Sequence, residues 1–466
     1  MSQVADIPSA GYQTSENYAL ISGYDIYDRD FYKKLIKKVP RAAALQWMRV
    51  VKGYMSKRQC IRHTYYYHEE GQWMSAAATI ESASDQTTFT RITLSAADHT
   101  DSGTSSFPVV GQLVVFENET VGFVRAVNRS TPSAHYVDVY PTVLGENAAL
   151  LTAAQAGSTM VFHSNAQQEE STATEIRVPK TNKVTNYVQT FREAYKVTDH
   201  AMQNSTEFTY KGQKFLHVKG IDDTMDRFAM QEDLGLLINP TSTSLTNANS
   251  KSVQLAKGLI PQITDNGNTL EYFGTPDMTT VDDAILILNR SYGEHEYLVG
   301  QGLDLNLGWK NWLIDFASGG DNNISFSAFD GGQQQAIKLN FKSISIEPYS
   351  FHMQTWDVLS HADTLGAGNM PYRNMAIFIP MGVTKNPDNG VAGSQGNEYE
   401  PYLNLVYADP GGAANQNKGD YCMFSDGALA PGGATNDTMN WRINVVSYKS
   451  LEVRCRNKFL ILRKAA

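Results

Sequence analysis

Long hydrophobic runs, paired cysteines and secretion signals are missing from this chain of 466 residues. No stretch approaches the roughly 18 apolar residues that a membrane-spanning helix needs, and the first residues lack the basic and apolar segments of a signal peptide. The three cysteines are an odd number without a Cys-x-x-Cys spacing, so neither a disulfide framework nor a zinc ribbon is indicated. These absences predict a soluble, cytosolically made protein with no membrane partner.

Motifs for catalysis and for cofactor binding are missing as well. There is no phosphate-binding loop, no Gly-x-Ser-x-Gly and no EF-hand loop. The nearest approach to a metal site is His63 and His68 beside Glu69 and Glu70. Because this spacing does not place both imidazoles on one helical face, an ordinary polar strand is the favoured interpretation. We predict no enzyme activity, no catalytic residue, no cofactor and no metal site.

Charge is present but unevenly distributed. The net charge is −9, yet residues 33–62 carry ten cations and no carboxylate, and residues 442–464 carry +6, which leaves −25 for the remainder. Such separation suits copies that pack basic segments against acidic neighbours, or a surface that meets DNA. A solvated helix face is the alternative for the first segment.

The region that follows is rich in short strands. Thr64–His68 and Trp73–Ile80 flank a polar bend and predict a hairpin or one edge of a long loop. Five further runs from about Asp85 to His163 alternate or are apolar, which predicts a compact barrel or sandwich. The arginines of this predicted module are outnumbered by its carboxylates, so a structural role is favoured over nucleic-acid binding.

Residues 176–200 form a long two-faced extended segment, and a helix follows over Asp222–Asn239, where Pro240 ends it. A long strand with an open edge invites pairing with other chains. We therefore expect contacts between copies from this strand and from the basic arm. The candidate contact residues are Lys33, Lys34, Lys37, Lys38, Arg41, Tyr187, Phe191, Arg192, Glu193 and Tyr195.

The last third alternates strands with glycine-rich loops. A helix is predicted from a capping-box-like start at Thr279, and strands over Ala336–Phe341, Ile344–Ile346 and Met375–Ile379. Trp441–Val446 and Ser450–Cys455 with Phe459–Leu462 predict two closing strands.

The order of these segments resembles a known family. A basic arm, a small β insert ending in Val161-Phe162-His163-Ser164-Asn165-Ala166, the strand Asn186-Tyr187-Val188-Gln189-Thr190-Phe191-Arg192 and then a long helix are similar to major capsid proteins of tailed double-stranded DNA bacteriophages. The abundance of asparagine and tyrosine resembles the capsid proteins of crAss-like phages of gut Bacteroidales. The specific motifs lie within residues 160–240.

The resemblance implies an α+β fold of the Hong Kong 97 type, with a small all-β insertion in the E-loop region. It implies the following division: 1–62, N-terminal arm; 63–204, extended E-loop with a β-rich insertion at about 85–165; 205–260, spine helix and first part of the P-domain; 261–400, A-domain; 401–466, C-terminal part of the P-domain.

The resemblance also implies the function and the partners. Copies would form hexamers and pentamers of the icosahedral virion capsid around phage double-stranded DNA. Portal, scaffold and auxiliary or head-decoration proteins would be partners, and contact with packaged DNA would be non-specific. The alternative is a β-rich virion or surface protein that binds glycan or another virion component.

Overall fold

The computed structural model describes most of the chain from Met55 to Ala465, and these residues fall into two compact units. One unit joins the residues up to Tyr65 with those from Thr185 onward, and the other is Tyr66–Val184. The description leaves out residues 1–54, 61, 71–76, 96–108, 129–134, 144, 168, 170–180, 200–208, 211–212, 248, 319–342, 347, 386–398, 409–415, 418–421, 431–435 and 466. The basic arm and the strand predicted over Ala336–Phe341 therefore lie outside the described residues.

The unit Tyr66–Val184 contains a closed β-barrel with the strand order β3-β4-β7-β6-β5-β8. Its inward positions alternate along each strand and are aliphatic or aromatic, as in Ile92, Val124 and Val139, which are fully buried. The short helix α2 (Asn147–Ala153) adds Leu150 to this core. The strands are β3 (Ala77–Asp85), β4 (Thr90–Leu94), β5 (Gln112–Phe116), β6 (Val121–Asn128), β7 (Tyr136–Pro141) and β8 (Thr159–Asn165).

The predicted hairpin between Thr64–His68 and Trp73–Ile80 is wrong. Strand β2 (Thr64–Glu70) pairs with β9 (Thr181–Tyr187), and β3 is one of the six strands of the barrel. The reason is that β3 pairs with β4 on one edge and with β8 on the other, which leaves no edge for β2.

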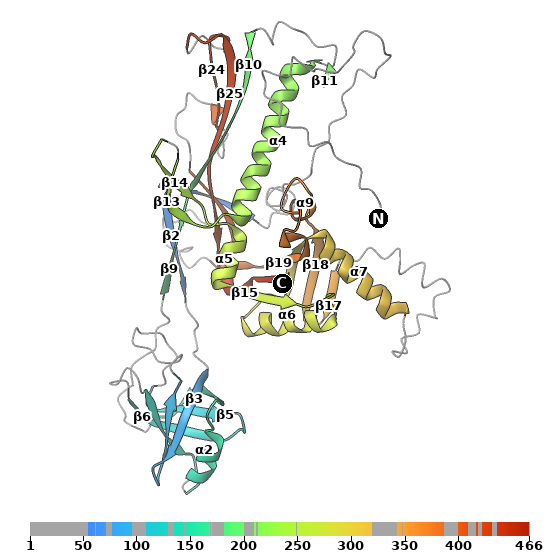
Figure 1. Ribbon diagram of the computed structural model, residues 1–466. Coiled ribbons are helices and arrows are strands. Elements are labelled where there is room, and N and C mark those ends of the chain that lie inside the picture. Colours follow the sequence, from blue (N-terminus) through green and yellow to red (C-terminus); the bar gives the residue numbers. More distant parts are fainter. Residues whose placement is uncertain are drawn as a thin grey trace. The chain divides into compact units, whose positions relative to one another are not determined.

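The other unit is built on a sheet with the order β1-β22-β25-β24-β23, in which β10 (Gln189–Thr198) also pairs with β25 (Asn440–Val453). Strand β25 is antiparallel to β10 over its first ten residues and to β22 over its last five. Figure 1 shows the long strands β10 and β25 running beside the helix α4 (Phe215–Ile238). The remaining strands are β1 (Met55–Cys60), β22 (Leu403–Ala408), β23 (Gln416–Asn417) and β24 (Cys422–Asp426).

Helix α4 has 24 residues and ends before Asn239-Pro240, as predicted. Its buried residues Phe228, Leu236 and Leu237 join the main core. A glycine inside a helix costs about 0.5–1 kcal/mol relative to alanine, yet α4 holds two where rings of β10 approach. A Cβ at Gly220 would clash with the Tyr195 ring, and one at Gly235 would come within 2.8 Å of Phe191.

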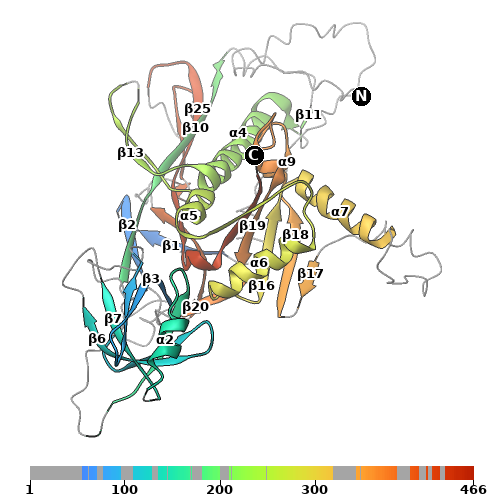
Figure 2. The ribbon, with the colours of Figure 1, turned by 60° about the horizontal axis from the view of Figure 1, so that its bottom comes forward.

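A second sheet has the order β15-β26-β19-β16-β18-β17. Helices α6 (Met278–Arg290) and α7 (Leu303–Ser318) pack on one of its faces, and the main core lies on the other (Figure 2). The capping box of α6 is formed by Asp277 and Thr280, so the helix begins slightly before the predicted start. The strands are β15 (Asn268–Tyr272), β16 (Glu296–Gln301), β17 (Ser343–Ile346), β18 (Tyr349–Thr355), β19 (Met375–Pro380) and β26 (Leu460–Lys464).

The two closing strands do not form a pair. Trp441–Val446 and Ser450–Val453 are one continuous strand, β25, and the run that ends at Leu462 is β26 of the second sheet. The chain turns between them at Cys455, whose φ of +53° is left-handed. The smaller described elements are α5 (Leu259–Asn266), α9 (Asp357–Ser360), η4 (Pro371–Asn374), η5 (Arg456–Lys458), β11 (Thr209–Tyr210), β12 (Gln213–Lys214), β13 (Ser242–Thr246), β14 (Ser252–Leu255), β20 (Val383–Lys385) and β21 (Tyr399–Pro401).

Replacing Phe191 with alanine tests the packing of β10 on α4. Phe191 is 7% exposed within the main core, so Phe191→Ala is expected to lower the free energy of unfolding by about 3–5 kcal/mol. The adjacent Arg192 is exposed, and Arg192→Ala is expected to cost less than about 1 kcal/mol. Urea unfolding of the two variants measures both values, and equal small losses would contradict this assignment of the core.

Candidate functional site

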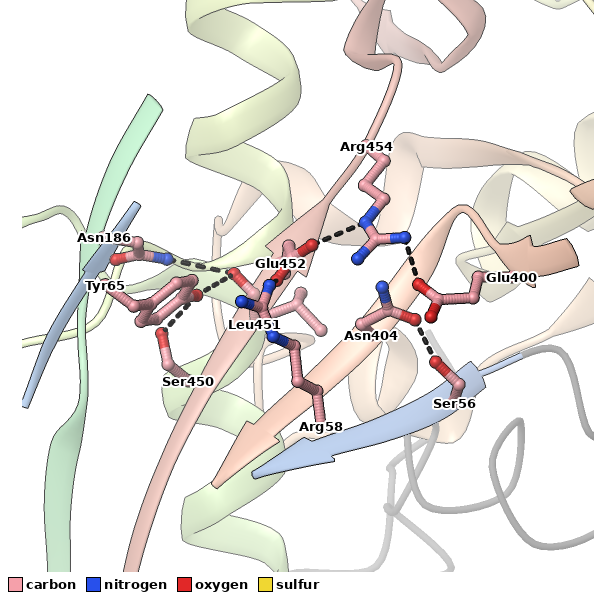
Figure 3. A network of polar contacts seen from close by, with 10 residues as sticks. All are labelled: Ser56, Arg58, Tyr65, Asn186, Glu400, Asn404, Ser450, Leu451, Glu452 and Arg454. Carbon is pink, nitrogen blue, oxygen red and sulfur yellow. Dashed lines mark hydrogen bonds and ion pairs between the residues drawn. The ribbon is translucent and has the colours of Figure 1, made fainter. Parts of the chain in front are cut away.

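The polar groups that stand out in the larger unit gather around strand β25 and the segment after it. Glu452 is fully buried and is held between two arginines from different elements (Figure 3). Arg58 of β1 approaches one carboxylate oxygen at 3.1 Å, and Nε of Arg454 donates to the other at 2.5 Å. Arg454 also pairs with Glu400 of β21. The carboxylate of Glu452 therefore joins β1 and the end of β25, and Arg454 extends the link to β21.

Buried cations need such partners. Burial would lower the pKa of the Arg454 guanidinium, but the carboxylates of Glu452 and Glu400 outweigh burial and raise that pKa above its ordinary value. A hydrogen bond between Ser56 and Asn404 adds a further link between β1 and β22 (Figure 3).

The carbonyl oxygen of Leu451 is the second feature. It accepts hydrogen bonds from Tyr65 Oη at 3.1 Å, Asn186 Nδ2 at 3.0 Å and Gln262 Nε2 at 2.9 Å. Strand β10 reaches only as far as Lys449 along this side of β25, so side chains replace the missing strand. These donors come from β2, β9 and α5. The first two are the strands that connect with the Tyr66–Val184 unit, and Figure 3 shows Tyr65 and Asn186 directed at the same carbonyl.

A buried ion pair joins α4 to β25. Lys449 Nζ lies 2.6 Å from Glu232 Oε2, and the two side chains are 6% and 4% exposed. The hydroxyl of Ser447 donates to the other oxygen of the same carboxylate. Lysine, serine and carboxylate are adjacent, but their burial leaves no access for a substrate, so the arrangement holds α4 in register on the strand.

A fourth cluster links the two sheets of this unit. Lys458 Nζ lies 2.5 Å from Glu294 Oε1 and 2.8 Å from the hydroxyl of Tyr402, which donates to the same carboxylate. Burial would raise the pKa of Glu294, but the hydrogen bonds from Lys458 and Tyr402 hold it below its ordinary value. Burial together with the nearby Glu294 raises the pKa of Tyr402.

These pairs change the interpretation of the basic C-terminal segment. Lys449, Arg454, Lys458 and Arg463 each pair with a carboxylate of the same chain. Most of its positive charge is thus neutralised internally and is not presented to another molecule.

The predicted contact residues are placed as follows. Lys33, Lys34, Lys37, Lys38 and Arg41 lie outside the described residues. Tyr187 is half-buried at the end of β9, and Arg192 is exposed on β10 with a hydrogen bond of 3.3 Å to Asn444.

The other three predicted residues lie against α4. Phe191 packs in the core beside α4, Glu193 forms an ion pair with Arg227 of α4, and the ring of Tyr195 lies over Gly220. The expectation of a contact between copies is wrong for Phe191, because the aromatic face of the strand is covered by the chain's own helix.

Sequence reasoning missed Glu232, Lys449 and Glu452. The available signal was a set of charged residues inside otherwise apolar runs, and such residues are buried only when they are paired. Within the described part of the chain no group of His, Cys, Asp and Glu could hold a metal ion. No described helix is both long and apolar enough to cross a bilayer.

Breaking the buried pair should destabilise the larger unit. Lys449→Met leaves the Glu232 carboxylate buried without its cation, which is expected to cost about 3–5 kcal/mol of unfolding free energy. The double variant Glu232→Met with Lys449→Met should recover most of that loss, because no uncompensated charge remains. Urea unfolding at neutral pH measures both, and equal losses in the single and double variants would contradict the pairing.

Acid stability should depend on Glu294. Its folded pKa lies below its unfolded value of 4.5, so its contribution is present above pH 4.5 and is lost as the pH falls through the lowered folded pKa. Glu294→Gln should therefore flatten the decline of Tm in this acid range. The exposed pair partner Glu271 offers a matched control, and a decline that changes equally in Glu271→Gln would refute a specific role for Glu294.

Comparison with known proteins gives the family. Residues 68–298 match the family model described as "SU10 major capsid protein". No curated protein matches the sequence.

Similar solved structures include two from phages and one from a GTA particle. "Microbacterium phage Oxtober96" is 8% identical with a TM-score of 0.42, covering 94% of this chain and 97% of that one. "Capsid of native GTA particle computed with C5 symmetry" is 9% identical with a TM-score of 0.40, covering 97% and 99%. "Mycobacterium phage Adephagia" is 8% identical with a TM-score of 0.40, covering 98% of both chains.

The match to a family of structural proteins agrees with the described polar clusters, each of which joins elements of the fold. It confirms the predicted α+β capsid fold of the Hong Kong 97 type and the absence of an enzymatic role. The finer resemblance to crAss-like phages stays a prediction. The chain is a major capsid protein of the tailed-phage type, and its copies associate into capsomers of the virion shell.

Proposed function

We propose that copies of this chain form hexamers and pentamers that close into an icosahedral shell around phage double-stranded DNA. The observation that carries the proposal is the family match over residues 68–298. It extends from β2 through the barrel, β10 and α4 to β16, so it includes nearly all of the unit Tyr66–Val184 and part of the other unit.

Exposed apolar residues of the second sheet support association between copies. Phe273 is 81% exposed at the end of β15, Leu307 is 45% exposed on α7, and Met370 is 54% exposed beside η4, which packs on α7. In a shell, neighbouring copies would cover these residues.

The division into capsid domains is part of the same proposal. The unit Tyr66–Val184 falls within the proposed E-loop, 63–204, and its barrel supports an insertion near 85–165. Helix α4 beside β10 and β25 supports a spine helix and P-domain over 205–260 and 401–466. The sheet covered by α6 and α7 supports an A-domain over 261–400, to which β26 is added from the C-terminal segment.

The proposed partners follow from how positive charge is distributed along the chain. Residues 33–62 carry ten cations and no carboxylate, and Arg58 among them pairs with Glu452, whereas four C-terminal cations pair with carboxylates inside the chain. The arm is therefore our candidate for contacts with neighbouring copies and for non-specific contact with packaged DNA. Portal, scaffold and auxiliary or head-decoration proteins are proposed partners of the assembled shell.

Charge reversal of the arm tests the proposal. Replacing Lys33, Lys34, Lys37 and Lys38 with glutamate should leave a folded subunit that assembles poorly, because attraction to acidic neighbours becomes repulsion. Electron microscopy with light scattering would compare shell yield with that of the wild type.

A control with four serines at the same positions separates lost attraction from new repulsion, and it should give an intermediate yield. Wild-type shell yield from the glutamate variant would remove the arm from the contacts. Wild-type protein that forms no shells, with or without the phage's other head proteins, would overturn the proposed function itself.

A further inference from the structure

Five side chains form a continuous stack on the outside of the barrel. The Arg91 guanidinium lies 4.1 Å from the ring centre of Tyr136 and 5.8 Å from that of Phe89. Phe89 stacks on Tyr140 with 5.1 Å between ring centres, and the Arg125 guanidinium lies 4.9 Å from the Tyr140 ring centre. We call Tyr136, Arg91, Phe89, Tyr140 and Arg125 the barrel ladder. It crosses β7, β4 and β6.

Arg91, at the centre of the ladder, is held in place although it is only partly buried. Nε and Nη2 of Arg91 donate to the two oxygens of Asp138 at 2.8 and 3.0 Å, which fixes the guanidinium plane between its rings. Surface arginines ordinarily keep much rotamer freedom and lose it when they bind. Here that freedom is already restricted, so a partner that contacts the ladder would lose little further entropy.

The composition of the ladder is that of an interface between proteins. Tyrosine and arginine are enriched at the energetic centres of such interfaces, whereas lysine and glutamate are depleted. The exposed neighbour opposite Arg91 on β3 is Ser84, a small residue that leaves room for an approaching surface. Among the described residues, Arg125 is exposed and has the Tyr140 ring as its contact, without a carboxylate partner.

The charge of the barrel identifies the kind of partner. Both arginines that the structure describes in the barrel belong to the ladder, and the described carboxylates are more numerous: Glu81, Asp85, Glu117, Glu119, Asp138 and Glu146. Because Arg91 is paired with Asp138, Arg125 is the ladder's one cation without a carboxylate partner among the described residues, and a single cation is too few for a long polyanion such as nucleic acid, which is bound through many phosphate contacts. The ladder suits a protein surface that carries a few carboxylates.

We propose that the barrel ladder docks onto a carboxylate-bearing surface of a second copy of this chain. Outside its two basic segments the chain carries −25, so every neighbouring copy offers acidic surface. The proposal rests on the shell-forming function, which holds copies next to one another at high local concentration. It assigns to the insertion a role in contacts between copies.

The first test is hydroxyl-radical labelling of whole shells and of subunits dissociated from them. Tyr136 and Tyr140 should be labelled more slowly in shells, because a second copy covers them. His163 lies on β8, which pairs with β3 and β5 and with no strand of the ladder, and its labelling serves as the reference. Equal labelling of the two tyrosines in shells and subunits would overturn the proposal while leaving the shell function intact.

The second test is a charge reversal with a matched control. Arg125→Glu should raise the critical concentration for assembly about tenfold at low salt, as expected for the loss of one interface arginine. The double variant His163→Glu with Asn165→Glu makes a similar charge change at exposed positions of β8 and should assemble like the wild type.

Two outcomes of the second test would contradict the proposal. If both variants assemble equally poorly, the effect is one of net charge and the ladder has no specific role. If Arg125→Glu assembles like the wild type, the ladder does not contact a second copy, and a neutral glycan or another virion protein becomes the candidate occupant. Circular dichroism should show a folded barrel in each variant, since all three positions are exposed.

Discussion

Burial of strand β25 is the constraint on which the larger unit depends. This strand has neighbours on both edges and is packed by α4, so its polar groups cannot reach water and must find partners within the chain. Glu452 pairs with Arg58 of β1 and with Arg454, which directly follows β25, and Lys449 pairs with Glu232 of α4. Because each partner comes from a different element, satisfying these charges also fixes where those elements lie.

The carbonyl of Leu451 in the same way connects β25 with the strands that lead to the barrel unit. Side-chain donors from β2, β9 and α5 converge on an acceptor that no strand reaches. The start of β2 and the end of β9 are thereby held to β25. A capsid subunit must transmit force between neighbouring copies, and a dense anchoring of this kind is suited to that task.

Sequence patterns predicted the barrel module and helix α4 because each has a strong local signal. The extended segment 176–200 was predicted as one strand, but its described residues form β9 and β10, which pair with β2 and β25 in different sheets. Alternating apolar residues marked the barrel strands, and Pro240 marked the end of α4. The same reasoning failed for β2 and β3, which are neighbours in sequence but pair with distant partners. It also failed for Phe191, since an aromatic face on a strand indicates burial without saying whether the covering surface belongs to the same chain or to another.

By itself the sequence determined the class of protein, the barrel module, the end of α4 and the excess of positive charge in residues 33–62. Tertiary structure alone decided that most of the C-terminal cations are paired, that β25 and β26 belong to different sheets, and that the barrel arginines lie against aromatic rings. The physical reason is distance along the chain. Local propensity and periodicity act over a few residues, whereas these pairings join residues far apart in sequence whose proximity arises only when the core is packed.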